Sequence, residues 1–304
     1  MKPEHPFSLL QRPLQGWHVW WTAIRPRTLS IAATPVVVGS SLAWSEGAAP
    51  VWPVLLATLI CALLIQVGTN LHNDVADFER GTDRPDRVGP LRVTAAGWVQ
   101  PAQVRQAARL SFAGALVLGL YLVARGGWPI LVAGLASLLA GWSYSGGARP
   151  ISHTAWGEAF VLVFFGLVAV MGSHWLQGGT GYLAAVLSGA VVGLPAAAVL
   201  LVNNFRDLEN DIRSGRRTLA AQLGDTGSWW AYAAMVMAPF GLLVLMALLG
   251  HWGVLLALLA APYAWSLLPR LRRSASGAQL NMLLGATARL GLLLGVLLSL
   301  GIFL

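Results

Sequence analysis

Residues 51–83 read VWPVLLATLICALLIQVGTNLHNDVADFERGTD, an apolar run that ends abruptly in acidic residues. No charged residue occurs from Val51 to Asn73, which is long enough for a helix to cross the hydrocarbon core of a bilayer. Asp74, Asp77 and Asp83 then follow within a few residues, although the chain holds only 12 Asp and Glu in total. The stretch predicts a membrane-spanning helix that ends in a polar site.

The composition of the whole chain supports a membrane protein. It is 56% hydrophobic and 11% charged, with a mean hydropathy of +0.65, whereas soluble domains carry about a quarter charged residues. We expect an all-α, polytopic membrane protein with about nine transmembrane helices around a central cavity, forming one domain over residues 1–304 with a polar cytoplasmic segment at 1–18. The predicted spans are 28–45, 51–72, 104–124, 127–144, 158–176, 182–203, 228–249, 252–268 and 282–303.

The basic residues predict the orientation of these spans. Of the 20 Lys and Arg, 19 are assigned to one side, in alternate loops or near the span ends beside them, with Arg289 inside the last span, and only Arg125 falls on the other side. Because basic loops stay in the cytoplasm, we expect a protein of the cell inner (cytoplasmic) membrane with its N-terminus on the cytoplasmic side and its C-terminus on the outer side. The net charge of +8 is therefore mainly a topology signal, and we expect no nucleic-acid partner.

Two Asn–Asp clusters end apolar helices on the predicted cytoplasmic side. Asn70, Asp74 and Asp77 are spaced by four and three residues, so they share one face of a helix. The second cluster lies in LVNNFRDLENDIRSGRRTLAAQLG, residues 201–224, where Asn203, Asp207 and Asp211 are spaced by four and four. The two clusters therefore lie at one membrane depth.

Carboxylates facing one another need a cation. Mg²⁺ prefers oxygen ligands and is usually held by a few carboxylates together with substrate phosphates, while arginines bind phosphate oxygens in bidentate fashion. The pattern favours a metal–diphosphate site at the membrane surface. Solvated helix ends with ordinary ion pairs are the alternative, and they do not explain two matching clusters.

The motifs resemble those of the UbiA superfamily of intramembrane prenyltransferases. NDVADFERGTD and RDLENDIRSGRRTLAAQLG are similar to its two Asp motifs, and RPRTLSIAATPVVVGSSLAW (25–44) and YSGGARPISHTAWGEAFVLVFFGLVAVMGSHWLQ (144–177) are similar to its first and central helices. Within the superfamily, the chain looks most like the group that prenylates 1,4-dihydroxy-2-naphthoate with decarboxylation, in menaquinone biosynthesis. The resemblance implies an active site that faces the cytoplasm, with a polyprenyl diphosphate and an aromatic acid as its substrates.

The resemblance also implies roles for particular residues. Two Mg²⁺ would bridge the Asp motifs and the diphosphate, one on Asp74 and Asp77 and the other on Asp207 and Asp211. The remaining candidates are Asn70 and Asn203 for the metals or their waters, Asp83 as a further catalytic group in the loop, and Asn73, Asn204, Arg25, Arg87, Arg149, Arg206 and Tyr144 for the substrates.

Other readings remain open from the sequence. The acceptor could be 4-hydroxybenzoate, homogentisate, a phylloquinone precursor, haem or chlorophyllide. A cation-coupled transporter is a rival from another class, but its carboxylates usually lie near the bilayer centre at broken helices, whereas these lie at helix ends. Besides the lipid bilayer, the sequence indicates no obligatory protein partner.

Overall fold

The computed structural model describes residues 16–82, 89, 92–273 and 276–304, and every regular element in these ranges is helical. The elements are α1 (Trp17–Ile24), η1 (Pro26–Thr28), α2 (Leu29–Ser45), α3 (Trp52–Glu79), α4 (Pro101–Gly126), α5 (Trp128–Ser145), η2 (Ile151–His153), α6 (Gly157–Leu162), η3 (Val163–Val168), α7 (Ala169–Leu176), α8 (Tyr182–Arg206), α9 (Leu208–Arg213), α10 (Leu219–Leu248), η4 (Trp252–Ala260), α11 (Ala261–Arg273) and α12 (Gly277–Gly301). The all-α architecture expected from the sequence is confirmed.

Eight helical segments in the described ranges are long and apolar enough to cross a membrane. They are Trp17–Ser45, Trp52–Glu79, Pro101–Gly126, Gly157–Leu176, Tyr182–Arg206, Leu219–Leu248, Trp252–Arg272 and Gly277–Gly301. The fourth of the nine predicted spans, 127–144, forms α5 but is not among the eight. Its 18 residues begin with Trp128 and Pro129 and end in WSYS, so its apolar part is short. The chain is a multi-pass membrane protein.

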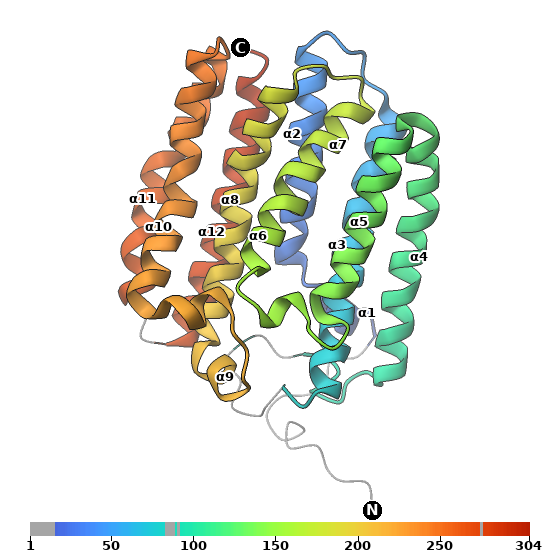
Figure 1. The fold of residues 1–304 in the computed structure, drawn as a ribbon, viewed down its shortest axis with the longest axis vertical. Coiled ribbons are helices and arrows are strands. Elements are labelled where there is room, and N and C mark those ends of the chain that lie inside the picture. Colours follow the sequence, from blue (N-terminus) through green and yellow to red (C-terminus); the bar gives the residue numbers. More distant parts are fainter. Residues whose placement is uncertain (1–15, 83–88, 90–91, 274–275) are drawn as a thin grey trace, which may run out of the picture.

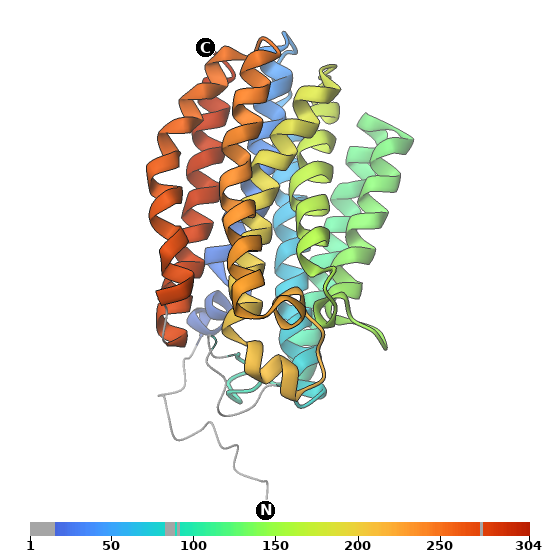
Figure 2. The same ribbon diagram turned by 60° about the vertical axis from the view of Figure 1, so that its left-hand side comes forward.

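The helices run side by side in two groups (Figures 1 and 2). The largest buried apolar cluster joins α8, α10, η4, α11 and α12, with Tyr232, Leu243 and Leu290 fully buried in it. On the other side of the molecule α3, α4 and α5 pack against one another. Helix α2 contacts α3, α7, α8 and α12 and so joins the two groups.

A π-helical turn and three glycines bring the segment α6–η3–α7 close to α8. Val163–Val168 forms the π-helical turn, and a Cβ added at Gly166 would lie 2.5 Å from the carbonyl oxygen of Gly189 and 2.8 Å from Cα of Gly193. Small residues allow backbones to approach closely in membrane helices, and π-helical turns are frequent near functional sites. This contact fixes the depth of the C-terminal end of α8, where the second Asp cluster lies.

The end of the molecule opposite the Asp clusters is held together by Glu46. Its carboxylate accepts hydrogen bonds from the backbone N–H groups of Thr180 and Gly181, at 2.7 and 3.0 Å, and lies 2.9 Å from Nε2 of His174. Burial raises the pKa of Glu46, but these hydrogen bonds outweigh it and hold the pKa below its usual value. Glu46 therefore has a structural role at the end of α2, away from the candidate site.

Candidate active site

Both Asp clusters line one cavity of about 350 Å³ between the two groups of helices. The C-terminal turns of α3 supply one side, and the junction of α8 and α9 supplies the other. The polar residues of the lining are Arg25, Thr28, Thr58, Gln66, Thr69, Asn70, Asn73, Asp77, Arg92, Ser137, Tyr144, Ser152, Ser173, Asn203, Asn204, Asp207, Asp211 and Arg216. The fold thus brings together two clusters whose Asp residues lie 130 or more positions apart in the sequence.

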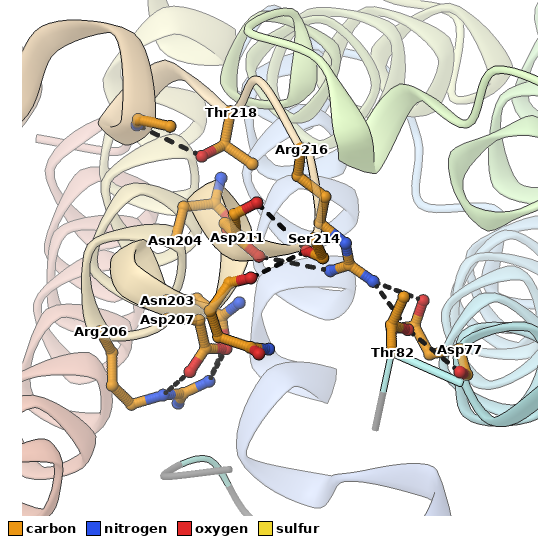
Figure 3. Close-up of polar contacts among 12 residues, drawn as sticks. Asp77, Thr82, Asn203, Asn204, Arg206, Asp207, Asp211, Ser214, Arg216 and Thr218 are labelled. Carbon is orange, nitrogen blue, oxygen red and sulfur yellow. Dashed lines mark hydrogen bonds and ion pairs between the residues drawn. The ribbon is translucent and has the colours of Figure 1, made fainter. Parts of the chain in front are cut away.

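Arg216 bridges the two clusters (Figure 3). Its NH2 atom lies 2.9 Å from Oδ1 of Asp77 and 3.0 Å from Oγ1 of Thr82, and its NH1 atom lies 3.6 Å from Oδ1 of Asp211. The loop makes this reach possible because Gly215, with φ of +73°, turns the chain back directly after α9. The guanidinium therefore offsets the repulsion between the two carboxylates.

Arg92 is a second arginine that the sequence interpretation did not assign to the site. Its NH2 atom lies 2.6 Å from Oδ2 of Asp77, and its NH1 atom donates to the carbonyl oxygen of Asn73 at 2.6 Å. Asp77 thus lies between Arg92 and Arg216. Both arginines follow a glycine in the loop next to an Asp motif, and this is the signal in the sequence that points to them.

Asp207 lies at the break between α8 and α9 and forms a bidentate pair with Arg206. The Nε and NH2 atoms of Arg206 lie 2.9 and 2.7 Å from the two carboxylate oxygens. The same guanidinium donates to Oδ1 of Asn203 at 2.9 Å and to Oδ1 of Asn281, on α12, at 2.7 Å. Arg206 does not line the cavity, so the structure places it as a buried partner of Asp207, where the sequence suggested a substrate contact.

Asp74 departs from the expected arrangement. Its two carboxylate oxygens accept hydrogen bonds from the backbone N–H groups of Val93 and Thr94, at 3.2 and 3.1 Å, and it does not line the cavity. The face of α3 that does so carries Asn70, Asn73 and Asp77. The reason is that the segment following Arg92 packs against this end of α3 and presents two buried donors that require an acceptor. The structure thus gives Asp74 the role of positioning the turn that carries Arg92.

We expect the Asp74→Ala variant to lose stability. Two buried N–H groups would lose their acceptor, which costs about 1–3 kcal/mol in the free energy of unfolding for each group left unsatisfied. Thermal unfolding of the purified protein in detergent measures the loss, with Asp225→Ala as the control because Asp225 is exposed. Equal melting temperatures for the two variants would contradict this role for Asp74.

Asn70 holds Arg25 in the site. Its Nδ2 atom donates to the carbonyl oxygen of Ile24 at 2.9 Å and to Oγ1 of Thr28 at 3.2 Å, while its Oδ1 atom accepts from Gln66. Arg25, between α1 and η1, is the one non-glycine residue with positive φ in the described ranges, at 55°. Such strained backbone is concentrated at functional sites. Asn70 therefore supports the turn that presents Arg25 to the cavity.

The lining fits a Mg²⁺-dependent site. Oδ1 of Asn73 is buried and has no hydrogen-bond partner among the described residues, while its Nδ2 atom donates to Ser145 at 2.8 Å. This amide oxygen, the carboxylate of Asp77 beside it and the carboxylates of Asp207 and Asp211 across the cavity together form a set of hard oxygen donors. Within the residues that the structure describes, no three His, Cys, Asp or Glu side chains are close enough to surround one ion. The set suits ions that complete their coordination with substrate oxygens and water.

The last turn of α5 and the loop after it add polar groups beside the metal-type ligands. Tyr144 and Ser152 line the cavity, and Oγ of Ser152 has no hydrogen-bond partner in the described part of the chain. Burial and the charge of Arg216 lower the pKa of His153 to about 4, against the opposing charge of Asp77, so His153 is neutral at neutral pH. Glu158, which the sequence interpretation missed, accepts a 2.9 Å hydrogen bond from Asn204 and orients that amide.

The remaining sequence candidates are Arg149, Asp83 and Arg87. Arg149 is exposed and does not line the cavity. Asp83 and Arg87 lie outside the described residues.

Comparison with known proteins shows similarity over most of the chain. The profile of the UbiA prenyltransferase family matches residues 32–301. The chain is 34% identical to the 1,4-dihydroxy-2-naphthoate octaprenyltransferase of Escherichia coli over 97% of this chain and 98% of that protein. It is 35% identical to the enzyme of the same name from Mycobacterium tuberculosis over 86% of this chain and 88% of that protein.

The fold is also similar to solved structures. A UbiA homologue from Archaeoglobus fulgidus bound to DMAPP and Mg²⁺ superimposes with a TM-score of 0.67 at 14% identity, covering 93% of this chain and 98% of that one. The apo structure of a UbiA homologue from Aeropyrum pernix gives a TM-score of 0.66 at 15% identity, covering 90% of this chain and 96% of that one.

Proposed function

The chain belongs to the UbiA prenyltransferase family, and from this premise we propose that its cavity transfers a polyprenyl group from a polyprenyl diphosphate to 1,4-dihydroxy-2-naphthoate. The observation that carries the proposal is the meeting of Asp77 with Asp207 and Asp211 across one cavity, with Arg216 between them. Relatives named for this reaction cover most of the chain, which supports membership in menaquinone biosynthesis.

The carboxylates and the orphaned amide oxygen would hold Mg²⁺, and through it the diphosphate end of the donor. Asp77 and Asn73 would ligate one ion, and Asp207 and Asp211 the other. Bound there, Mg²⁺ neutralises the leaving diphosphate, as metals do at phosphoryl oxygens. Asp74 and Asn70 act indirectly in this proposal, because they hold the turns that present Arg92 and Arg25.

Arginines complete the binding of the diphosphate. Arg216 already reaches both clusters, and Arg25 lines the same cavity. Guanidinium groups bind phosphate oxygens in bidentate fashion and are not deprotonated in proteins. As the allylic carbon–oxygen bond breaks, the charge that develops on the diphosphate is shared among these groups, and the allylic carbon becomes cationic.

The acceptor approaches the allylic carbon from the loop after α5. The ring carbon that bears the carboxylate forms the new bond to the allylic carbon, whose bond to the diphosphate oxygen breaks. The carboxylate then leaves as carbon dioxide, and the electrons of its bond to the ring restore the aromatic ring, so the products are a demethylmenaquinol, carbon dioxide and diphosphate. Tyr144 lines the cavity here, and the face of an aromatic ring stabilises a nearby cation. Ser152 and Asn204 offer hydrogen bonds that orient the acceptor.

The protein works in the cytoplasmic membrane with its site facing the cytoplasm. The C-terminal ends of α3 and α8, which carry the Asp clusters, lie at one end of the molecule, and the C-terminal end of α4 lies at the opposite end (Figure 1). Arg125 is in the last turn of α4. Basic loops remain in the cytoplasm, which supports this orientation, with residues 1–304 acting as a single domain.

Sealed vesicles that contain the protein test acceptor and orientation together. Geranyl diphosphate and Mg²⁺ are added outside, with 1,4-dihydroxy-2-naphthoate, 4-hydroxybenzoate or homogentisate as the acceptor. We expect a decarboxylated prenyl product by mass spectrometry with the naphthoate alone, in inverted but not right-side-out vesicles, and loss of product with excess chelator. A product with another acceptor in the absence of naphthoate transfer would overturn the assignment.

A further inference from the structure

The cavity continues from the Asp clusters deep into the apolar part of the molecule. Its lining beyond the polar end comes from α3, α4, α5 and α7 and includes Cys61, Leu122, Ile130 and Leu176. Ile130 is near the start of α5, whereas Tyr144 is at its other end beside the Asp clusters. One continuous cavity therefore follows almost the whole length of α5.

Three glycines on three helices leave the cavity wide at its apolar end. They are Gly119 on α4, Gly134 on α5 and Gly172 on α7, and all three line the cavity. A Cβ added at any of them would meet no atom within 4 Å. At Gly141, which also lines the cavity, a Cβ would lie 2.8 Å from Oγ1 of Thr69. Close helix packing explains why position 141 is a glycine, but it does not explain the glycines at 119, 134 and 172.

The level of Gly134 lies well beyond the site of chemistry. Ten residues of α5 separate it from Tyr144, which is about 15 Å at the usual helical rise. Cys61 lies 12 residues before Asn73 on α3, about 18 Å by the same measure. Leu120 and Leu135 line the cavity near this level and are 59% and 46% exposed, so the helices do not close around the apolar end of the cavity.

We propose that Gly119, Gly134 and Gly172 form a passage for the distal isoprene units of a long polyprenyl donor, and that Gly134 determines which chain lengths are accepted. This inference rests on the Asp clusters as the diphosphate site. A donor anchored there directs its apolar tail past the three glycines, along the part of the described lining that carries no charged residue. The hydroxyls of Thr58, Ser137 and Ser173 in this part each donate to a carbonyl oxygen of their own helix. A short donor ends before them, so a side chain at Gly134 discriminates by length.

The Gly134→Phe variant tests the passage. The measured quantity is the ratio of kcat/KM for octaprenyl diphosphate to kcat/KM for geranyl diphosphate, with 1,4-dihydroxy-2-naphthoate as the acceptor. We expect the ratio to fall at least about tenfold, which is what blocking a few methylene-sized contacts achieves. Gly241→Phe is the matched control, since Gly241 is exposed on α10, has open space around it and does not line the cavity. An unchanged ratio in Gly134→Phe would overturn the inference.

The single cysteine provides a readout that does not depend on turnover. The chain contains one Cys, and Cys61 lines the apolar part of the cavity. In the wild-type protein with Mg²⁺, we expect octaprenyl diphosphate to slow alkylation of Cys61 by N-ethylmaleimide several-fold and geranyl diphosphate to leave the rate unchanged. Equal protection by both donors, or by neither, contradicts the passage. Failure of the wild type to transfer either prenyl group would instead contradict the proposed function.

Discussion

Replacing Asp211 with asparagine is expected to reduce prenyl transfer by about a hundred- to a thousandfold, the loss that follows removal of one group that helps to stabilise a developing charge at other active sites. Asp211 is buried, lines the cavity and lies across it from Asp77. The amide keeps the shape of the side chain but removes its negative charge, so one Mg²⁺ loses a charged ligand. Single-turnover transfer of a geranyl group measures the loss at saturating Mg²⁺.

Glu209→Gln is the matched control for this variant. Glu209 lies on the same short helix, α9, but its side chain is 87% exposed and pairs with Arg213 one turn away. It should retain nearly wild-type activity, because an exposed ion pair contributes little. Comparable losses in the two variants would mean that the charge of α9 as a whole matters, and that Asp211 has no special place in the site.

The Arg216→Gln variant is expected to raise KM for the prenyl diphosphate by roughly ten- to a hundredfold, with a smaller effect on KM for the naphthoate. A hydrogen bond to a charged group contributes about 1.5–3 kcal/mol, and Arg216 is the arginine that reaches both Asp clusters. Steady-state kinetics with geranyl diphosphate as the varied substrate measures the change.

Arg217→Gln separates this effect from a general loss of positive charge. Arg217 is the next residue but is exposed, and its backbone N–H, which the substitution keeps, donates to the carbonyl oxygen of His153. We expect little change in either KM. If Arg216→Gln instead leaves KM for the diphosphate at the wild-type value, Arg216 serves only to bridge Asp77 and Asp211, and the diphosphate is bound by other groups.

The helices could be predicted from the sequence because a bilayer imposes one requirement on every span. A run of about 20 apolar residues is visible without knowledge of its neighbours, and helix α3 appears where its apolar run predicts it. The π-helical turn at Val163–Val168 could not be predicted in this way. It depends on the contact of Gly166 with Gly189 and Gly193 on α8, which is a property of the packed structure.

The site was predictable as a cluster but not in the role of each member. Spacing brings Asp77, Asp207 and Asp211 to one cavity, as expected. Spacing alone cannot show that Asp74 accepts hydrogen bonds from Val93 and Thr94, because those donors belong to a turn outside α3. Arg92 and Arg216 were missed for the same reason, since loops bring them to Asp77.

Metal binding in the presence of a donor analogue tests the central proposal most directly. Mn²⁺ replaces Mg²⁺ as a paramagnetic probe, and electron paramagnetic resonance counts the bound ions with geranyl thiodiphosphate present. We predict two Mn²⁺ per chain in the wild type and in Glu209→Gln, and a loss of bound Mn²⁺ in Asp211→Asn. Equal Mn²⁺ binding by Asp211→Asn and the wild type would contradict the proposal that the two Asp clusters together hold the metals and the diphosphate.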